Sequence, residues 1–109
     1  MDKVFFMNEA INEAKKAYDK GETPIGAVIV KDNEIIGRGH NLTETLKDST
    51  AHAEMLAIKD AAETLGGWRL TNCDLYVTME PCIMCSGAIV NSRIKNIIIG
   101  TKHIKNANI

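Results

Sequence analysis

The sequence lacks long apolar runs and has few aromatic residues, prolines and cysteines. No apolar stretch approaches the roughly 18 residues that a membrane-spanning helix needs, so we expect no membrane segment. Aromatic residues make up 5% of the 109 residues, whereas hydrophobic residues make up 45% and charged residues 25%. Those last two values are ordinary for a globular protein and exclude a mainly disordered chain. The length predicts one domain, spanning residues 1–109.

Acidic residues are absent after Glu80. Residues 81–109 therefore carry a net charge of +4, whereas residues 1–80 carry nine basic and fourteen acidic residues, a net charge of −5. A basic end on an acidic body is a weak indication of a polyanionic partner. A solvated face with a basic tail explains the same pattern without any partner, so charge alone does not decide between them.

The three cysteines are an odd number, and two of them form the motif Cys82-x-x-Cys85. The first residues include Asp2 and lead into a charged amphipathic segment, so we expect no secretory signal peptide and a cytoplasmic location. In a chain that is not exported, this cysteine spacing indicates metal or redox chemistry more than a structural disulfide.

Hydrophobic periodicity and turn residues predict an α/β layered domain with the order α-β-β-α-β-α-β. The expected helices span residues 3–20, 51–65 and 81–91, and the expected strands span residues 25–30, 35–40, 74–78 and 95–100. Residues 31–34 are expected to form a hairpin turn, because Asp and Asn tolerate a left-handed backbone, and residues 41–50 a polar loop. The last helix should cross between two parallel strands.

Helix ends and buried faces can also be predicted from the residues. Asp2 and Thr50 are the expected caps of the first two helices, Gly21 and Gly66 should end them, and Pro81 suits the first turn of the third. Apolar residues at helical spacing supply the expected apolar stripes of these helices. They are Val4, Met7, Ile11, Ala14 and Tyr18, then Met55, Ile58, Ala62 and Leu65, then Ile83, Met84, Ile89 and Val90.

Residues with metal-ligating chemistry gather near the starts of the second and third expected helices. Cys82 and Cys85 are three residues apart, so both sulfurs project from one helix face, and His52 lies in the first turn of the other helix. One imidazole and two thiolates make three zinc ligands, which leaves a fourth position for water, as in catalytic zinc sites. Glu54 lies close enough in sequence to His52 to move protons for such a water.

Each of these residues also has a less specific interpretation. A Cys-x-x-Cys motif alone fits a redox pair, His52 alone fits a buried histidine, and Glu54 alone fits a carboxylate that the helix dipole favours. Cys73 is a possible fourth ligand, which would make the zinc structural. We expect it to be a small buried residue instead, because free cysteine usually packs as a small hydrophobe.

The complete pattern His52-Ala53-Glu54 followed by Pro81-Cys82-x-x-Cys85 resembles the signature of the zinc deaminases. From about residue 5 to residue 102 the chain resembles the tRNA-specific adenosine deaminases of the cytidine/deoxycytidylate deaminase superfamily. The long fourth stretch below is the most specific to this branch. The stretches that carry the resemblance are TPIGAV (23–28), TAHAEM (50–55), WRL (68–70), LYVTMEPCIMC (75–85) and SRI (92–94).

This resemblance implies a fold, a cofactor and a reaction. The implied fold is a three-layer α/β/α sandwich of the cytidine deaminase type; family members continue with a further strand and helix, whereas this chain stops at Ile109. The implied cofactor is one zinc ion per chain, held by His52, Cys82 and Cys85. The implied reaction is attack of activated water on C6 of adenine, with Glu54 as the proton carrier and inosine as the product.

The resemblance also implies how the substrate is held. Asn41 would hydrogen-bond the base, although alone it could be a turn residue after a strand, and the backbone N–H of Ala53 would fix the edge of the base. Lys102, His103 and Lys105 match a segment that contacts RNA in the family; Lys105 fits the family pattern, whereas His103 stands where an Asp is usual. The expected partner is the anticodon stem-loop of a tRNA, and the family is usually homodimeric.

Two other functions remain open on the sequence alone. A deaminase of a free base or nucleoside, such as guanine or cytidine, would use the same zinc ligands but needs no basic surface. A non-catalytic zinc domain would use Cys73 as a fourth ligand and would have no need of Glu54. Incubation with an adenosine-containing stem-loop separates the first of these from RNA deamination, and the sulfur count around the metal identifies the second.

Overall fold

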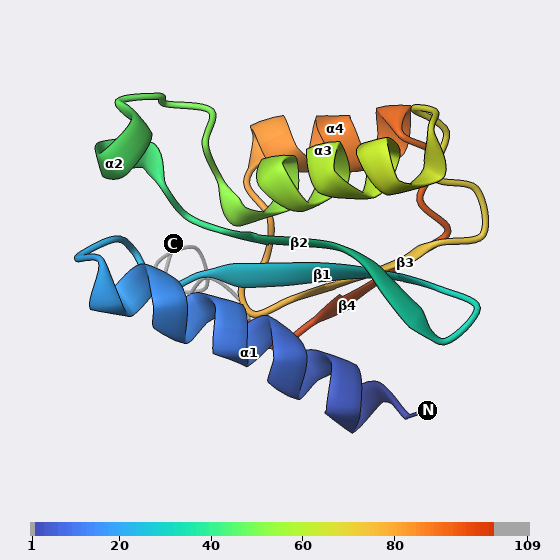
Figure 1. Cartoon of the computed structure of the whole chain (residues 1–109), viewed down its shortest axis with the longest axis horizontal. Helices are drawn as coiled ribbons and strands as arrows, with labels where there is room; N and C mark the ends of the chain where they lie inside the picture. The colour runs from blue at the N-terminus through green and yellow to red at the C-terminus, as the bar shows by residue number, and fades with distance from the viewer. Residues whose placement is uncertain (1, 102–109) are drawn as a thin grey trace.

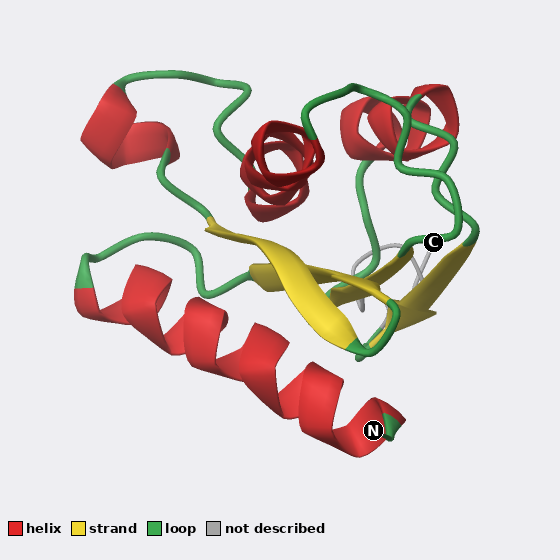
Figure 2. Cartoon of the chain, turned by 45° about the vertical axis from the view of Figure 1, so that its right-hand side comes forward, coloured by secondary structure: helices red, strands yellow, loops and turns green. Residues whose placement is uncertain are grey.

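A computed structural model describes residues 2–101, which form a four-stranded sheet between two layers of helices (Figures 1 and 2). Helix α1 covers one face of the sheet, and α3 and α4 cover the other. In chain order the elements are α1 (Lys3–Asp19), β1 (Gly26–Lys31), β2 (Glu34–His40), α2 (Thr43–Leu46), α3 (Ala53–Leu65), β3 (Asp74–Val77), α4 (Ile83–Asn91) and β4 (Asn96–Ile99). The α/β/α sandwich is therefore confirmed. Within the described part of the chain, no helix is both long and apolar enough to cross a membrane.

The sheet has the strand order β2-β1-β3-β4. Strand β1 is antiparallel to both of its neighbours, whereas β3 and β4 are parallel and joined through α4, as expected. Val77 pairs with Ile99, so the C-terminal ends of β3 and β4 lie side by side at the same end of the sheet. Just beyond that end, the Glu80 N–H donates to the Thr101 carbonyl at 2.8 Å. The topology thus brings residue 101 close to the start of the cysteine motif.

Several expected turns and caps are confirmed. Asp32 and Asn33 have φ angles of 52° and 63°, the left-handed conformation that a tight β1–β2 hairpin requires. The Asp2 carboxylate accepts from the Phe5 N–H at 2.9 Å and caps α1. Gly66, with φ 75°, ends α3 in the left-handed conformation.

The expected starts of the two later helices were each two residues too early. Helix α3 begins at Ala53, and its N-cap is His52 rather than Thr50. The Thr50 hydroxyl instead donates to the Asp48 carboxylate at 2.7 Å, closing a local turn. Helix α4 begins at Ile83, so Pro81 precedes the N-cap. The segment 41–50, expected to be loop throughout, contains the short helix α2.

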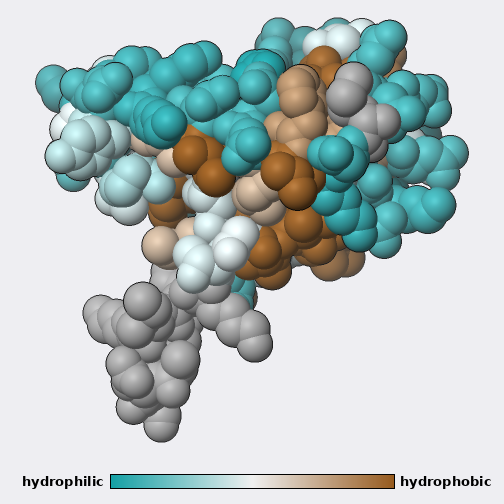
Figure 3. All heavy atoms as spheres, turned by 90° about the horizontal axis from the view of Figure 1, so that it is seen from below, coloured by the Kyte–Doolittle hydropathy of each residue, from teal (hydrophilic) through white to brown (hydrophobic). Residues whose placement is uncertain are grey.

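The expected apolar stripes are only partly buried, because several of the residues that α1 and α3 turn toward the sheet are alanines. On α1, Val4 and Tyr18 are 68% and 71% exposed, and on α4, Ile83 is 92% exposed. Figure 3 shows that on one side of the molecule hydrophobic residues gather near the middle, with hydrophilic residues around them. The residues that α1 buries are Phe6, Ala10, Glu13, Ala14 and Ala17, and those that α3 buries are Ala53, Glu54, Ala57 and Ala61.

Close contact between helix and sheet backbones explains this choice of small residues. A Cβ atom on Gly39 of β2 would lie 2.3 Å from the Ala53 carbonyl, and one on Gly37 would lie 2.5 Å from the Ala57 carbonyl. Only glycine on the strand, facing alanine on the helix, permits so short a separation. The result is that the first turn of α3, with His52 and Glu54, is held directly on the end of β2.

Candidate metal centre and active site

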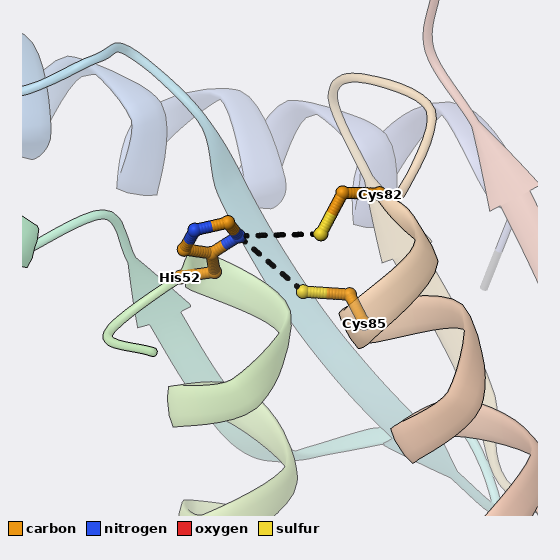
Figure 4. A group of neighbouring side chains, drawn as sticks. All are labelled: His52, Cys82 and Cys85. Atoms are coloured by element: carbon orange, nitrogen blue, oxygen red, sulfur yellow. Dashed lines mark hydrogen bonds between the residues drawn. The ribbon is translucent and has the colours of Figure 1, made fainter. Parts of the chain in front are cut away.

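His52, Cys82 and Cys85 converge at the N-termini of α3 and α4, on the helical layer above the sheet (Figure 4). The Nδ1 atom of His52 lies 3.6 Å from the sulfur of Cys82 and 3.6 Å from the sulfur of Cys85. His52 and Cys82 are the N-caps of their helices, and neither side chain caps its own helix. Both side chains are turned toward each other instead, which is the arrangement that a shared ligand requires.

The three ligand atoms fit a zinc ion. All of them lie within 4.8 Å of one another, and among residues 2–101 this is the group of histidine, cysteine and acidic side chains that could hold a metal. Tetrahedral zinc with bonds of about 2.3 Å to sulfur and about 2.0 Å to nitrogen places those atoms roughly 3.5 Å apart, close to the separations found here. Three protein ligands leave a position for water, so the site has the composition of a catalytic zinc centre.

The electrostatics of the site favour a bound cation. Cys85 is fully buried, and this burial, together with the nearby charge of Glu54, raises the pKa of the Cys85 thiol. A divalent cation reverses that effect, because a coordinating thiol loses its proton. Glu54 itself is 4% exposed and follows His52 by two residues in the first turn of α3. A buried carboxylate beside a cysteine-rich metal site is well placed to exchange protons with a metal-bound water.

The two residues expected to hold the substrate base lie against each other. The side-chain Oδ1 of Asn41 accepts from the Ala53 N–H at 2.9 Å, and the Asn41 side chain is buried. Asn41 thereby caps α3 from the end of β2, in place of the His52 side chain. Within the described residues, the Asn41 amide nitrogen Nδ2 has no hydrogen-bond partner. Two N–H donors therefore remain for a ligand.

Cys73 lies away from the metal ligands. Its side chain is fully buried in the cluster between the sheet and the α3–α4 layer, and its thiol donates to the Thr71 carbonyl at 3.7 Å. Burial raises the pKa of this thiol, as expected for a cysteine packed in the core. The expectation that Cys73 is a small buried residue is confirmed. Lys102, His103 and Lys105 lie outside the described residues.

Sequence reasoning missed Glu22, a buried carboxylate bonded to the segment that follows Asn41. It lies between α1 and β1, and it accepts hydrogen bonds from the first turn of α2. The one feature of the sequence that could have drawn attention to Glu22 is its position: it is an acidic residue between the Lys20-Gly21 helix end and the Thr23-Pro24 segment. The partners of that carboxylate are about twenty residues away along the chain, so no local pattern identifies them.

Comparison with known proteins identifies the family. Residues 1–101 match the cytidine and deoxycytidylate deaminase zinc-binding region. The chain belongs to this family. The zinc deaminase resemblance of the sequence motifs is thereby confirmed, and the three converging side chains are those that the family signature contains.

Within this family, the chain is similar to tRNA adenosine deaminases and to a guanine deaminase. The chain is 58% identical over 98 residues to a tRNA-specific adenosine deaminase from Aquifex aeolicus, covering 90% of this chain and 65% of that protein. It thus spans less than two thirds of that relative's length. A solved structure from work on A-to-I editing by wobble-position tRNA:A34 deaminases has a TM-score of 0.92 at 46% identity, covering 96% of this chain and 81% of that one. A solved guanine deaminase from Bacillus subtilis has a TM-score of 0.93 at 41% identity, covering 99% and 69%.

Proposed function

We propose that the chain catalyses zinc-dependent hydrolytic deamination of adenosine to inosine in tRNA, at the wobble position of the anticodon. The observation that carries this proposal is the three-ligand group His52, Cys82 and Cys85 with the buried Glu54 carboxylate next to it. This set supplies both a metal site with room for water and a proton carrier. It fits hydrolysis of an amidine C–N bond better than a structural role, since a structural zinc needs four protein ligands and no carboxylate.

The residues of the site have distinct roles in this reaction. One zinc ion per chain, when bound, lowers the pKa of water toward neutrality and so provides a nucleophile. Glu54 would accept a proton from the attacking water and deliver it to ring nitrogen N1 of adenine. It would then take the remaining proton of the hydroxyl added at C6 and pass it to the amino group, which leaves as ammonia while C6 becomes a carbonyl. Both transfers require a carboxylate that stays within hydrogen-bond reach, which its buried position in the first turn of α3 provides.

Asn41 is the residue that orients the base. Its Oδ1 is occupied by the Ala53 N–H, so its Nδ2 group is directed to a ring-nitrogen acceptor of adenine. The Ala53 N–H, which was expected to fix the edge of the base, is engaged by Asn41, so Ala53 acts on the base through the position that it gives to the Asn41 side chain. Both residues are buried and hydrogen-bonded to each other, an arrangement that reduces the entropic cost of orienting the base.

The choice of RNA over a free base rests on sequence similarity rather than on fold. The TM-scores to the tRNA:A34 deaminase and to the guanine deaminase differ by 0.01, so the backbone alone does not separate the two substrates. Identity is 58% to the Aquifex aeolicus tRNA-specific enzyme and 41% to the guanine deaminase. The basic composition of residues 81–109 supports an RNA partner, and activity on tRNA implies a cytoplasmic location.

Helix α4 provides the surface on which we expect a second copy of the chain to pack. Two of its large apolar residues, Ile83 and Val90, are 92% and 69% exposed, although they belong to a helix made almost entirely of apolar and small residues. Small residues between them, Ser86 and Gly87, permit close approach of another helix. Large apolar side chains at this exposure are typical of an interface, and the metal ligands at the start of α4 would then lie close to it.

The deciding experiment is a substrate panel. The zinc-loaded chain is incubated with an adenosine-containing anticodon stem-loop and, separately, with adenosine, cytidine and guanine, while inosine and released ammonia are measured. We expect inosine only with the stem-loop. Turnover of guanine or cytidine, with no reaction on RNA, would favour the free-base alternative.

A further inference from the structure

The Glu22 carboxylate is buried and accepts four hydrogen bonds from one turn of another element. Its residue is 5% exposed, directly after the end of α1. One oxygen, Oε1, accepts from the Glu44 N–H at 3.2 Å and the Thr43 hydroxyl at 3.5 Å. The other, Oε2, accepts from the Thr45 N–H at 2.7 Å and the Thr45 hydroxyl at 2.6 Å. The hydrogen bonds from these donors outweigh the effect of desolvation and lower the pKa of Glu22, so the carboxylate stays ionised.

These bonds replace a cap that α2 cannot make for itself. The N-cap of α2 is Leu42, which has no side-chain oxygen, so the backbone N–H groups of Glu44 and Thr45 need an acceptor from elsewhere. Glu22 supplies it from a point far away along the chain. A four-residue helix is too short to be stable alone, so its place depends on this contact.

The segment that Glu22 holds begins at the candidate site. Asn41 precedes Leu42, and the Asn41 N–H donates to the Ile25 carbonyl at 3.2 Å. Its side chain bonds the Ala53 N–H at the first turn of α3. Leu42 in turn donates to the Ala51 carbonyl at 3.0 Å. Asn41 therefore lies between two fixed points, the sheet end on one side and α2 with its Glu22 anchor on the other.

We propose that Glu22 is a positioning residue for the deamination reaction, which holds the 41–46 segment so that the Asn41 side chain stays aligned with Ala53 and the metal ligands. This inference rests on the proposed function for its catalytic meaning. Glutamine cannot replace Glu22, because its NH2 group would face N–H donors of α2 where the carboxylate accepts. The contact orders the site without touching the substrate.

The test compares Glu22→Gln with Asp2→Asn in the zinc-loaded full chain. Asp2 is a matched control, because its carboxylate also caps a helix but contacts only the Phe5 N–H at the far end of α1. For Glu22→Gln we expect kcat/KM on the stem-loop to fall at least about tenfold, mainly through KM, since Asn41 holds the base in both the ground state and the transition state. Asp2→Asn should leave KM unchanged.

A second readout does not depend on activity. Amide hydrogen exchange should become at least about tenfold faster at Ala53 in Glu22→Gln, because the Asn41 acceptor is no longer fixed. Exchange at Leu56, whose N–H donates to the His52 carbonyl, should not change. Thr45→Val removes only the hydroxyl donor, so it should give a smaller effect in the same direction.

A double variant separates positioning from general destabilisation. In an Asn41→Ala background, Glu22→Gln should cause little further loss of kcat/KM, because the two residues act through one contact. Additive losses, or unchanged KM with unchanged Ala53 exchange, would overturn the proposal. If the parent chain does not deaminate the stem-loop, the proposed function fails, and exchange at Ala53 alone decides whether Glu22 positions Asn41.

Discussion

Asn41 Oδ1 and the Ala53 N–H are joined at 2.9 Å, and this bond links the end of β2 to the first turn of α3. His52, the N-cap residue of α3, is therefore free to turn its imidazole toward Cys82 and Cys85 instead of capping its own helix. A residue that would normally stabilise the helix end is thereby available as a metal ligand, and Asn41 supplies the missing cap.

Metal content and ligation test the candidate centre. We expect one zinc per chain, with an X-ray absorption spectrum that fits one nitrogen, two sulfurs and one oxygen. Cys73→Ala should keep the zinc, because the Cys73 side chain is packed in the core, whereas Cys85→Ser should release it. A spectrum that requires three or more sulfurs would contradict the catalytic interpretation.

Glu54→Gln tests the proton carrier. Glutamine keeps the size of the side chain but cannot accept and return a proton, so kcat should fall by at least about 10²-fold. Zinc content and thermal stability should stay close to those of the parent, since Glu54 is outside the ligand group. Activity within a few-fold of the parent would remove Glu54 from the mechanism.

Two glycine substitutions test the packing of α3 on the sheet. Gly39→Ala places a Cβ atom 2.3 Å from the Ala53 carbonyl, so helix or strand must move, and we expect a loss of about 1–3 kcal/mol in the free energy of unfolding. Gly67→Ala is the control, because a Cβ there meets nothing within 4 Å and its φ is not positive. Urea titration should show a lower midpoint for Gly39→Ala alone.

The dependence of stability on pH tests the ion pairs of Glu13. Burial raises the pKa of Glu13, but hydrogen bonds from Lys16, His40 and Arg38 outweigh it and hold the pKa below its ordinary value. A carboxyl with a lowered folded-state pKa stabilises the protein above its unfolded-state pKa of about 4.3, and that contribution is lost as pH falls. The stability gap between the parent and Glu13→Gln should therefore be large at pH 7 and shrink below about pH 4.3. A gap that is constant with pH would contradict this.

Salt dependence tests the basic end of the chain. Lys102→Ala and Lys105→Ala should each weaken stem-loop binding and reduce the slope of log K against log salt by roughly 0.7, the single-strand value for one phosphate contact. Thr101, the last described residue before them, lies beside Glu80, which is two residues before the metal ligand Cys82. Lys95→Ala, at the opposite end of β4, should have a smaller effect. Unchanged affinity and slope in both lysine variants would favour a free-base substrate.

The sequence determined the order of the elements and the metal ligands, because both depend on local signals. The elements follow from signals that act within a few residues: the periodicity of hydrophobic residues, turn residues such as Asp32-Asn33, and the Asp2 cap. The spacing of Cys82 and Cys85 places two sulfurs on one helix turn. Tertiary structure decided which helix faces are buried and what holds the site together. Alanines of α1 and α3 face the sheet, whereas Val4 and Tyr18 remain exposed. The short distance between the helix and strand backbones limits the size of the side chains between them, and no local sequence pattern reports that distance. The Glu22 and Asn41 contacts likewise join segments that are 12 to 23 residues apart, so only the folded chain brings them together.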